Sequence, residues 1–168
     1  MTETLIQVEN LSRYYQNHRA INQLSFTLKA GEVLGFLGPN GAGKSTTMQV
    51  ISGNLAPSDG EVKIAGYDII DTPREAKSQL GYLPEHPPLY RDASVDEYLG
   101  YCARLHRIPR TAIKAALSKV KAQCGLETNG ARLIRNLSKG YQQRVGIAQA
   151  IIHDPPVVIL DEPTVGLD

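Results

Sequence analysis

The sequence predicts an α/β fold arranged around a glycine-rich loop, with a small antiparallel edge sheet and an inserted all-helical subdomain. Three observations lead to this prediction. Residues 38–46 form a glycine-rich stretch between a short apolar run and a potential helix. The first thirty residues alternate between apolar and polar side chains, as strands do. From residue 94 to about residue 153 the apolar side chains recur at helical spacing.

The glycine-rich stretch has the features of a phosphate-binding loop. It fits the spacing G-x-x-x-x-G-K-[ST] with every fixed position filled. The apolar run of residues 33–37 is typical of a buried parallel strand, and residues 46–52 can open a helix. Glycines let backbone N–H groups turn toward phosphates, and the helix directs its positive dipole end at them. The stretch consists of Gly38, Pro39, Asn40, Gly41, Ala42, Gly43, Lys44, Ser45 and Thr46.

Two side chains of this loop suit a triphosphate and its metal ion. Lys44 would bring a mobile positive charge to the β- and γ-phosphates. Ser45 would offer a hydroxyl ligand to Mg²⁺, a hard cation that prefers oxygen. The alternative is a glycine-rich turn that binds nothing, and the complete match between a strand and a helix argues against it.

Length and composition narrow the classes of protein. The chain has 168 residues, 42% of them hydrophobic, which suits one domain or a domain with an insertion and excludes disorder. Eighteen Lys and Arg against seventeen Asp and Glu give a net charge of +1, so nothing indicates nucleic-acid binding. Cys102 and Cys124 lie on apolar sides of helical patterns, which favours buried thiols. No leader and no run of about 18 apolar residues occurs, so we expect any membrane connection to come through a partner.

The N-terminal region indicates strands with an aromatic pair between them. Residues 5–9 and 24–28 alternate and predict a small antiparallel edge sheet. Tyr14 and Tyr15 lie between them in a polar segment, where an exposed ring could stack on a nucleobase. Ordinary surface or core tyrosines are the alternative.

The middle of the chain alternates between short elements. A turn at residues 57–60 leads into a strand over residues 61–64. A short helix is expected to start with Pro73 in its first turn and to end near Leu80. Another short strand follows, and the three prolines of residues 84–88 prevent its continuation.

The helical region has clear start and stop signals. Ser94 and Glu97 form a capping box at the start of the first helix, and Gly125 ends the second. The third helix is expected to start at Ser138. Residues 157–160 then return to a buried strand.

Two acids, Asp161 and Glu162, follow this last apolar strand. If the strand runs parallel beside the loop strand, its carboxyl end arrives at the phosphate crevice. Asp161 could then bind Mg²⁺ through its water shell, and Glu162 could polarise the water that attacks the γ-phosphate. A solvated strand end is the alternative, which the complete phosphate loop makes weaker.

Four segments together resemble the ATP-binding subunit of ABC transporters, and the resemblance covers the whole chain. In the second segment, Leu-Ser-Lys-Gly-Tyr-Gln-Gln-Arg, Lys139 and Tyr141 depart from the usual Leu-Ser-Gly-Gly-Gln signature of that family. The resemblance implies a P-loop NTPase core of residues 1–84 and 155–168 and a helical subdomain over residues 85–154. The four segments are residues 38–46, 137–144, 160–164 and 166–168.

The resemblance also implies roles for further residues. Tyr15 matches the aromatic that stacks on adenine, with Tyr14 as the alternative. Ser138 and Gly140 of the signature would meet the γ-phosphate bound by the other subunit of a head-to-tail homodimer. Glu85 falls where the family usually has glutamine, and its carboxylate can still bind Mg²⁺ or a water.

One expected element of the family is missing from this sequence. The family carries a γ-phosphate-contacting histidine about thirty residues after the acid pair, on a central strand, whereas all four histidines here precede Asp161. We therefore expect a single ABC ATPase domain, residues 1–168, truncated after the loop that follows the acid pair.

The resemblance implies an ATP-binding subunit that hydrolyses Mg²⁺-bound ATP to drive transport through a separate membrane permease. It would lie in the cytoplasm on the inner face of the membrane, and its connector of residues 81–90 looks like those of exporter or gliding-type subunits. The alternatives are a soluble ABC ATPase without a permease, and a truncated nucleotide-binding fragment without turnover.

Overall fold

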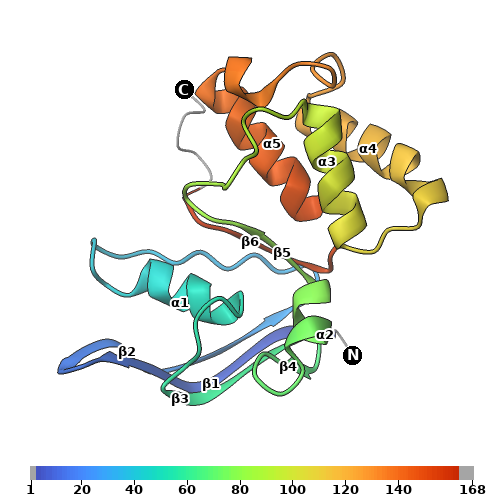
Figure 1. Cartoon of the computed structure of the whole chain (residues 1–168). Coiled ribbons are helices and arrows are strands. Elements are labelled where there is room, and N and C mark those ends of the chain that lie inside the picture. Colours follow the sequence, from blue (N-terminus) through green and yellow to red (C-terminus); the bar gives the residue numbers. More distant parts are fainter. Residues whose placement is uncertain (1–2, 163–168) are drawn as a thin grey trace. The chain divides into compact units, whose positions relative to one another are not determined.

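A long hairpin opens the chain, as the alternating N-terminal residues predict. In the computed structural model, which describes residues 3–162, β1 (Thr4–Tyr15) pairs antiparallel with β2 (His18–Lys29) and with β3 (Asp59–Ile64). β3 also pairs with β4 (Tyr67–Asp68), which gives the strand order β2-β1-β3-β4 (Figure 1). The predicted edge sheet is confirmed, and its first two strands are longer than predicted.

Two helices complete the first of two compact units, Met1–Leu80. α1 (Lys44–Ile51) lies over one face of the sheet, and α2 (Pro73–Ser78) begins at the predicted proline. Apolar side chains from the sheet and the helices form the core of this unit because they share the covered face. The most deeply buried are Val8, Leu11, Val50, Ile51, Val62 and Ile64.

The predicted buried strand over residues 33–37 is not formed, so that prediction is wrong. Val33 is 98% exposed and Leu37 is 96% exposed. A strand needs a neighbour that pairs with its backbone N–H and C=O groups, and within residues 3–162 no strand pairs with this segment. Phe36 is held by its side chain instead, with its ring 5.5 Å from that of Phe26 in an edge-to-face arrangement.

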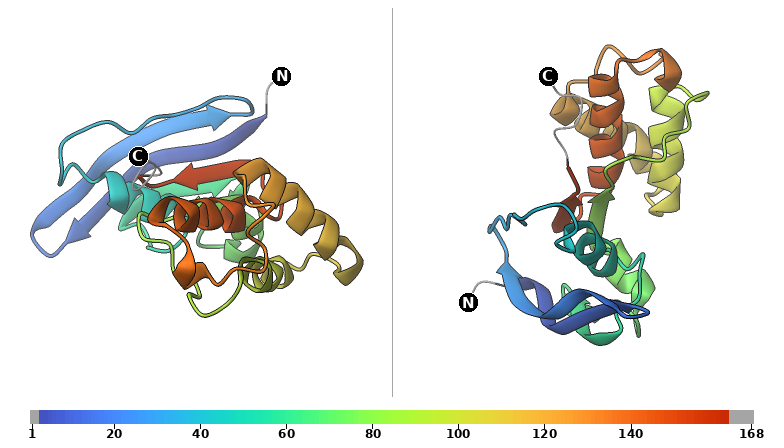
Figure 2. Two further views of the ribbon diagram at one scale, coloured as in Figure 1. Left: turned by 90° about the horizontal axis from the view of Figure 1, so that it is seen from above. Right: turned by 90° about the vertical axis from the view of Figure 1, so that its left-hand side faces the viewer.

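The second compact unit, Gly81–Asp168, contains the helices. Two views of the chain show them gathered on α5 (Figure 2). No helix in the described part of the chain combines the length and the apolar character needed to span a bilayer. The division into a core of residues 1–84 and 155–168 and a subdomain of residues 85–154 stays a prediction. The helices are α3 (Val95–Leu105), α4 (Arg110–Cys124), the 3₁₀ turn η1 (Ile134–Asn136) and α5 (Lys139–Ile151).

The helix boundaries follow the sequence signals. Ser94 Oγ accepts a hydrogen bond from the Glu97 N–H at 3.2 Å, and the Glu97 carboxylate accepts one from the Ser94 N–H at 2.8 Å. These contacts form the predicted capping box. Gly125 ends α4 in the left-handed conformation with φ 64°, and Ser138 is the N-cap of α5. The predicted starts and stops are therefore confirmed.

The core of the second unit is formed by the apolar faces of these helices. Cys102 is buried and Cys124 is half-buried, and both are free thiols. Beside this core, β5 (Leu80–Leu83) pairs with β6 (Val157–Leu160) in a two-stranded sheet. The largest fully buried side chains of the core are Val95, Leu99, Val120, Leu126, Ile134 and Val145.

Gly81 in β5 has no room for a side chain. An added Cβ would overlap the backbone carbonyl oxygen of Ala150 and lie 3.0 Å from Pro155 Cγ. We expect Gly81→Ala to destabilise the second unit by roughly 1–3 kcal/mol, because a backbone atom cannot rotate away. Urea unfolding followed by circular dichroism measures this change.

A helical glycine is the matched control. Gly100 lies within α3, and an added Cβ would have only Arg104 Nη1 nearby, at 3.5 Å. Gly100→Ala should be neutral or stabilising by up to about 1 kcal/mol, because alanine favours the helix. Equal unfolding midpoints for Gly81→Ala and the unsubstituted chain would contradict the prediction.

Candidate functional site

The glycine-rich loop leads directly into α1. Gly41 and Gly43 have φ values of 84° and 87°, which glycine adopts far more readily than other residues. α1 begins at Lys44 with Gly43 as its N-cap. No side chain caps this end, and the first turn contains no acidic residue. The N–H groups at the start of α1 are therefore available to an anion.

Gly43 also joins the loop to the hairpin. An added Cβ would overlap the backbone oxygen of Ala20 in β2 and lie 3.7 Å from Ile21 Cγ1. Thr47 strengthens the junction, since its backbone N–H and its hydroxyl both donate to the Gly43 carbonyl at 2.8 Å. The end of the loop is thus fixed by backbone packing on β2.

Lys44 folds back across the loop. Its Nζ donates to the carbonyl oxygens of Gly38, at 2.5 Å, and Pro39, at 2.9 Å. The ammonium group therefore lies at the opposite end of the loop from the Lys44 backbone. Ser45 is exposed in the first turn of α1 and Thr46 is half-buried. This arrangement lets Lys44 exchange carbonyl acceptors for phosphate oxygens.

The two tyrosines lie at the closed end of the β1–β2 hairpin. Tyr15 is 43% exposed and Tyr14 is half-buried. In the antiparallel register Tyr14 lies opposite Arg19, and Tyr15 lies opposite His18. Both aromatics belong to the same unit as the glycine-rich loop.

The acid pair follows β6 in the second unit, as the sequence predicts. Asp161 is half-buried, and its backbone N–H donates to the Leu83 carbonyl at 2.9 Å. Burial, and then the negative charge of Asp161, raise the pKa of the Tyr82 hydroxyl. Glu162 is exposed and has a φ of 46°. Its carboxylate is therefore accessible to water.

The signature segment begins α5. Ser138 is exposed, and its Oγ accepts a hydrogen bond from the Tyr141 N–H at 3.4 Å. Gly140 is half-buried in the first turn. The guanidinium group of Arg144 lies 5.1 Å from the Tyr141 ring centre. Ser138 therefore caps the helix while its hydroxyl remains accessible.

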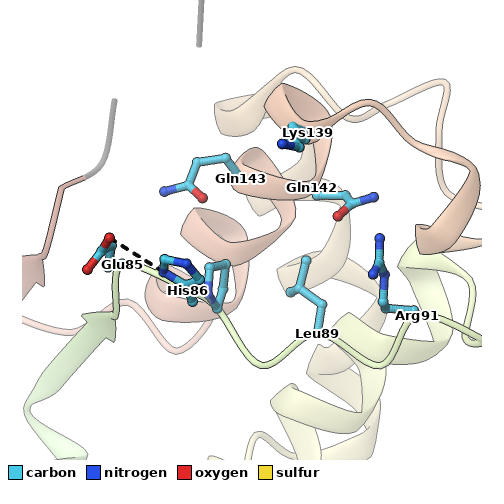
Figure 3. Close-up of a pocket in the computed structure, with 8 residues that line it drawn as sticks. Glu85, His86, Leu89, Arg91, Lys139, Gln142 and Gln143 are labelled. Carbon is cyan, nitrogen blue, oxygen red and sulfur yellow. Dashed lines mark ion pairs between the residues drawn. The ribbon is translucent and has the colours of Figure 1, made fainter. Parts of the chain in front are cut away.

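A cavity of about 310 Å³ lies between the connector after β5 and the start of α5 (Figure 3). The Glu85 carboxylate is 3.7 Å from His86 Nδ1. Gln143 is only 5% exposed, and its Nε2 has no hydrogen-bond partner among the described residues. Figure 3 shows its amide directed toward the side of Glu85 and away from Arg91.

The structure separates the predicted site residues into two groups. The loop and Tyr15 belong to the unit of residues 1–80, and the other predicted residues belong to the unit of residues 81–168. Two residues were not predicted. Gln143 lies within the signature segment of residues 137–144 but was given no role of its own there, whereas the two-residue alternation of β1 could have identified Arg13 on the same face as Tyr15. The second group consists of Glu85, Ser138, Gly140, Asp161 and Glu162.

Comparison with known proteins identifies the family. A family model described as ABC transporter matches residues 21–165. The chain belongs to the ABC transporter family. In general, ATP-binding subunits of this family bind nucleotide, hydrolyse ATP and pair with membrane permease components.

Individual relatives agree with this assignment. The chain is 37% identical to the ABC transporter ATP-binding protein NatA of Bacillus subtilis, over 98% of this chain and 69% of NatA. It is 38% identical to the SkfA peptide export ATP-binding protein SkfE of the same species, over 98% of this chain and 68% of SkfE. Several other relatives are longer, and the chain spans only 53% or 54% of them.

A solved structure confirms the fold class. The structure of cbiO1 from Clostridium perfringens, part of the ABC transporter complex cbiONQ, matches with a TM-score of 0.86 and 31% identity, over 99% of this chain and 68% of that chain. The chain therefore has the predicted α/β fold of a P-loop NTPase of the ABC class, with an antiparallel edge sheet and helical part.

Two glycine substitutions separate backbone strain from overlap in the loop. We expect Gly43→Ala to lower the melting temperature and to weaken ATP binding by roughly tenfold or more, because it adds both a strained φ and an overlap with Ala20. Gly41 has a similar φ, but an added Cβ would meet nothing within 4 Å. Gly41→Ala should therefore cost less in both measurements. Equal effects of the two substitutions would show that the Gly43 contact with β2 is unimportant.

Proposed function

We propose that the chain binds Mg-ATP through residues 38–46 and hydrolyses it to drive transport through a separate membrane permease. The observation that carries this proposal is the junction of the loop with α1. Gly43 places the uncapped helix start at the end of the loop, and Lys44 reaches back to the other end. Together they provide N–H groups, a helix dipole and a positive charge for phosphates.

The proposed magnesium site uses oxygen ligands. Ser45 supplies a hydroxyl, and Asp161 and Glu85 supply carboxylates, all of which suit Mg²⁺. No cluster of three or more His, Cys, Asp or Glu side chains able to hold a metal occurs among residues 3–162. When bound, the ion would neutralise negative charge on the β- and γ-phosphates.

We assign the hydrolytic step to Glu162. Its exposed carboxylate at the end of β6 is available to orient and polarise a water molecule. Asp161, directly before it, would hold the hydration shell of the metal ion. The division of roles follows the usual requirement of phosphoryl transfer, in which positioning and charge neutralisation dominate.

The proposed functional state is a homodimer. Ser138 presents an exposed hydroxyl at the start of α5, and Gly140 adds no side chain at its own position in the first turn. These groups suit a γ-phosphate bound by the other subunit. Tyr15 would stack on the adenine of the nucleotide bound by its own subunit.

The partner and location are proposed from the relatives. cbiO1 is described as part of a transporter complex, and SkfE as a peptide export protein. We propose that this chain likewise acts with a membrane permease, on the inner face of the cell membrane, in an export system.

The first test removes the positively charged side chain of Lys44 from the loop. Lys44→Ala should weaken ATP binding by about 10²-fold or more, because a charge-assisted contact in a partly dry site is worth a few kcal/mol. Isothermal titration of the variant and the unsubstituted chain with Mg-ATP measures this loss. Lys63→Ala, which removes a lysine paired with Glu61 on β3, is the control and should leave affinity unchanged. Equal affinities for the Lys44→Ala variant and the unsubstituted chain would refute the proposed site.

The second test concerns the partner subunit. In a Glu162→Gln background, Ser138→Arg should leave ATP binding by one subunit unchanged and abolish ATP-driven dimerisation, since the added side chain blocks the γ-phosphate of the partner. Sedimentation velocity with and without ATP measures dimerisation. Ser118→Arg, at an exposed position of α4, is the matched control. A normal ATP-driven dimer of the Ser138→Arg variant would sink the proposed role in trans.

A further inference from the structure

Two arginine–tyrosine pairs lie at the closed end of the β1–β2 hairpin. The guanidinium carbon of Arg13 is 4.9 Å from the Tyr15 ring centre, and that of Arg19 is 5.3 Å from the Tyr14 ring centre. Successive side chains of a strand point to opposite faces of the sheet. The two pairs therefore present their rings on opposite faces of the hairpin.

The register shows which face belongs to the glycine-rich loop. Arg13 lies opposite Ile21, and residues directly opposite each other share a face. Ile21 is buried, and its Cγ1 is 3.7 Å from the position that a Cβ at Gly43 would take. Arg13 and Tyr15 are therefore on the face where the loop joins α1.

Arg13 is fixed in place by the chain that follows α1. Its Nη1 donates to the Ala56 carbonyl at 3.1 Å. Its Nε is buried and has no hydrogen-bond partner within the described residues. Nearby, Ser58 Oγ accepts a hydrogen bond from the Tyr14 N–H at 3.1 Å. The guanidinium group is thus held over one face of the Tyr15 ring, whose exposure of 43% leaves ring surface accessible.

We infer that Arg13 is a positioning residue that fixes the Tyr15 ring for stacking by a purine base. This inference rests on the proposed function, because it takes the triphosphate to be bound by the glycine-rich loop. A ring already held by a cation on one face loses less conformational freedom when a base stacks on the other face. Arg19 holds Tyr14 in the same way on the opposite face and has no such role.

Two ligands distinguish binding of the base from binding of the phosphates. ATP contains both, whereas inorganic tripolyphosphate contains only the phosphates, so binding of tripolyphosphate reports the loop alone. Arg13→Ala should weaken ATP binding roughly three- to tenfold and leave tripolyphosphate binding unchanged. Tyr15→Ala should weaken ATP binding roughly tenfold, the usual size of a base–aromatic stacking contribution. Isothermal titration in the presence of Mg²⁺ measures all affinities.

The chain offers matched controls. Arg19→Ala and Tyr14→Ala remove the same chemistry from the opposite face and should leave both ligands unaffected. In a Tyr15→Ala background, Arg13→Ala should cause no further loss of ATP affinity, because Arg13 acts through the ring. Arg13→Lys keeps the charge and should restore part of the affinity.

The outcomes distinguish a failure of this inference from a failure of the proposed function. Equal losses for ATP and tripolyphosphate in Arg13→Ala would show a general structural role and overturn the inference. A further loss of ATP affinity when Arg13→Ala is added to the Tyr15→Ala background would overturn the inference as well. So would a loss specific to ATP that occurs in the Arg19→Ala variant and not in the Arg13→Ala variant. Failure of the unsubstituted chain to bind either ligand would overturn the proposed function itself, and the positioning role with it.

Discussion

The close approach of Gly43 to the backbone of β2 is the contact on which the proposed nucleotide site depends. Only a residue without a Cβ fits against the Ala20 carbonyl, and its positive φ directs the chain from the loop into α1. This contact sets where the helix starts and where Lys44 leaves the helix. It also brings the loop to the face of the hairpin that carries Tyr15. One backbone junction therefore fixes, within one unit, the residues that we propose for the phosphates and for the base.

Local signals explain which parts of the fold and site were predictable from the sequence. The loop spacing, the capping box at Ser94 and the glycine stop at Gly125 depend on a few neighbouring residues, and the structure has each of them. The strand over residues 33–37 was predicted from its apolar residues and is not formed, since a strand also needs a distant partner. Arg13 and Gln143 were missed because their neighbours are distant in the sequence. The strand register determines what lies beside Arg13, and helix packing buries Gln143.

The residues of the proposed site belong to two units, and this division separates nucleotide binding from turnover in the proposal. The loop, with Lys44 and Ser45, belongs to residues 1–80, and the acids Asp161 and Glu162 belong to residues 81–168. Within one subunit, the contacts that we propose from residues 38–46 to the phosphates and from Tyr15 to the base thus belong to the first unit, whereas Ser138 and Gly140 of the second unit would meet the γ-phosphate of the partner. Hydrolysis as we propose it needs acids from the second unit as well. Nucleotide affinity therefore tests the geometry of the first unit, whereas turnover tests whether both units act on one nucleotide.

Glu85 shows how a charged residue can occupy a position where the family usually has glutamine. Its side chain is 47% exposed, so water solvates the carboxylate and the charge costs the second unit little by itself. The carboxylate becomes unfavourable when a phosphate approaches, because the two negative charges repel more strongly once the water between them is displaced. A metal ion between them would reverse the sign of that interaction. The same carboxylate would therefore oppose a bare triphosphate and favour a magnesium-bound one, which makes the substitution compatible with Mg-ATP as the ligand.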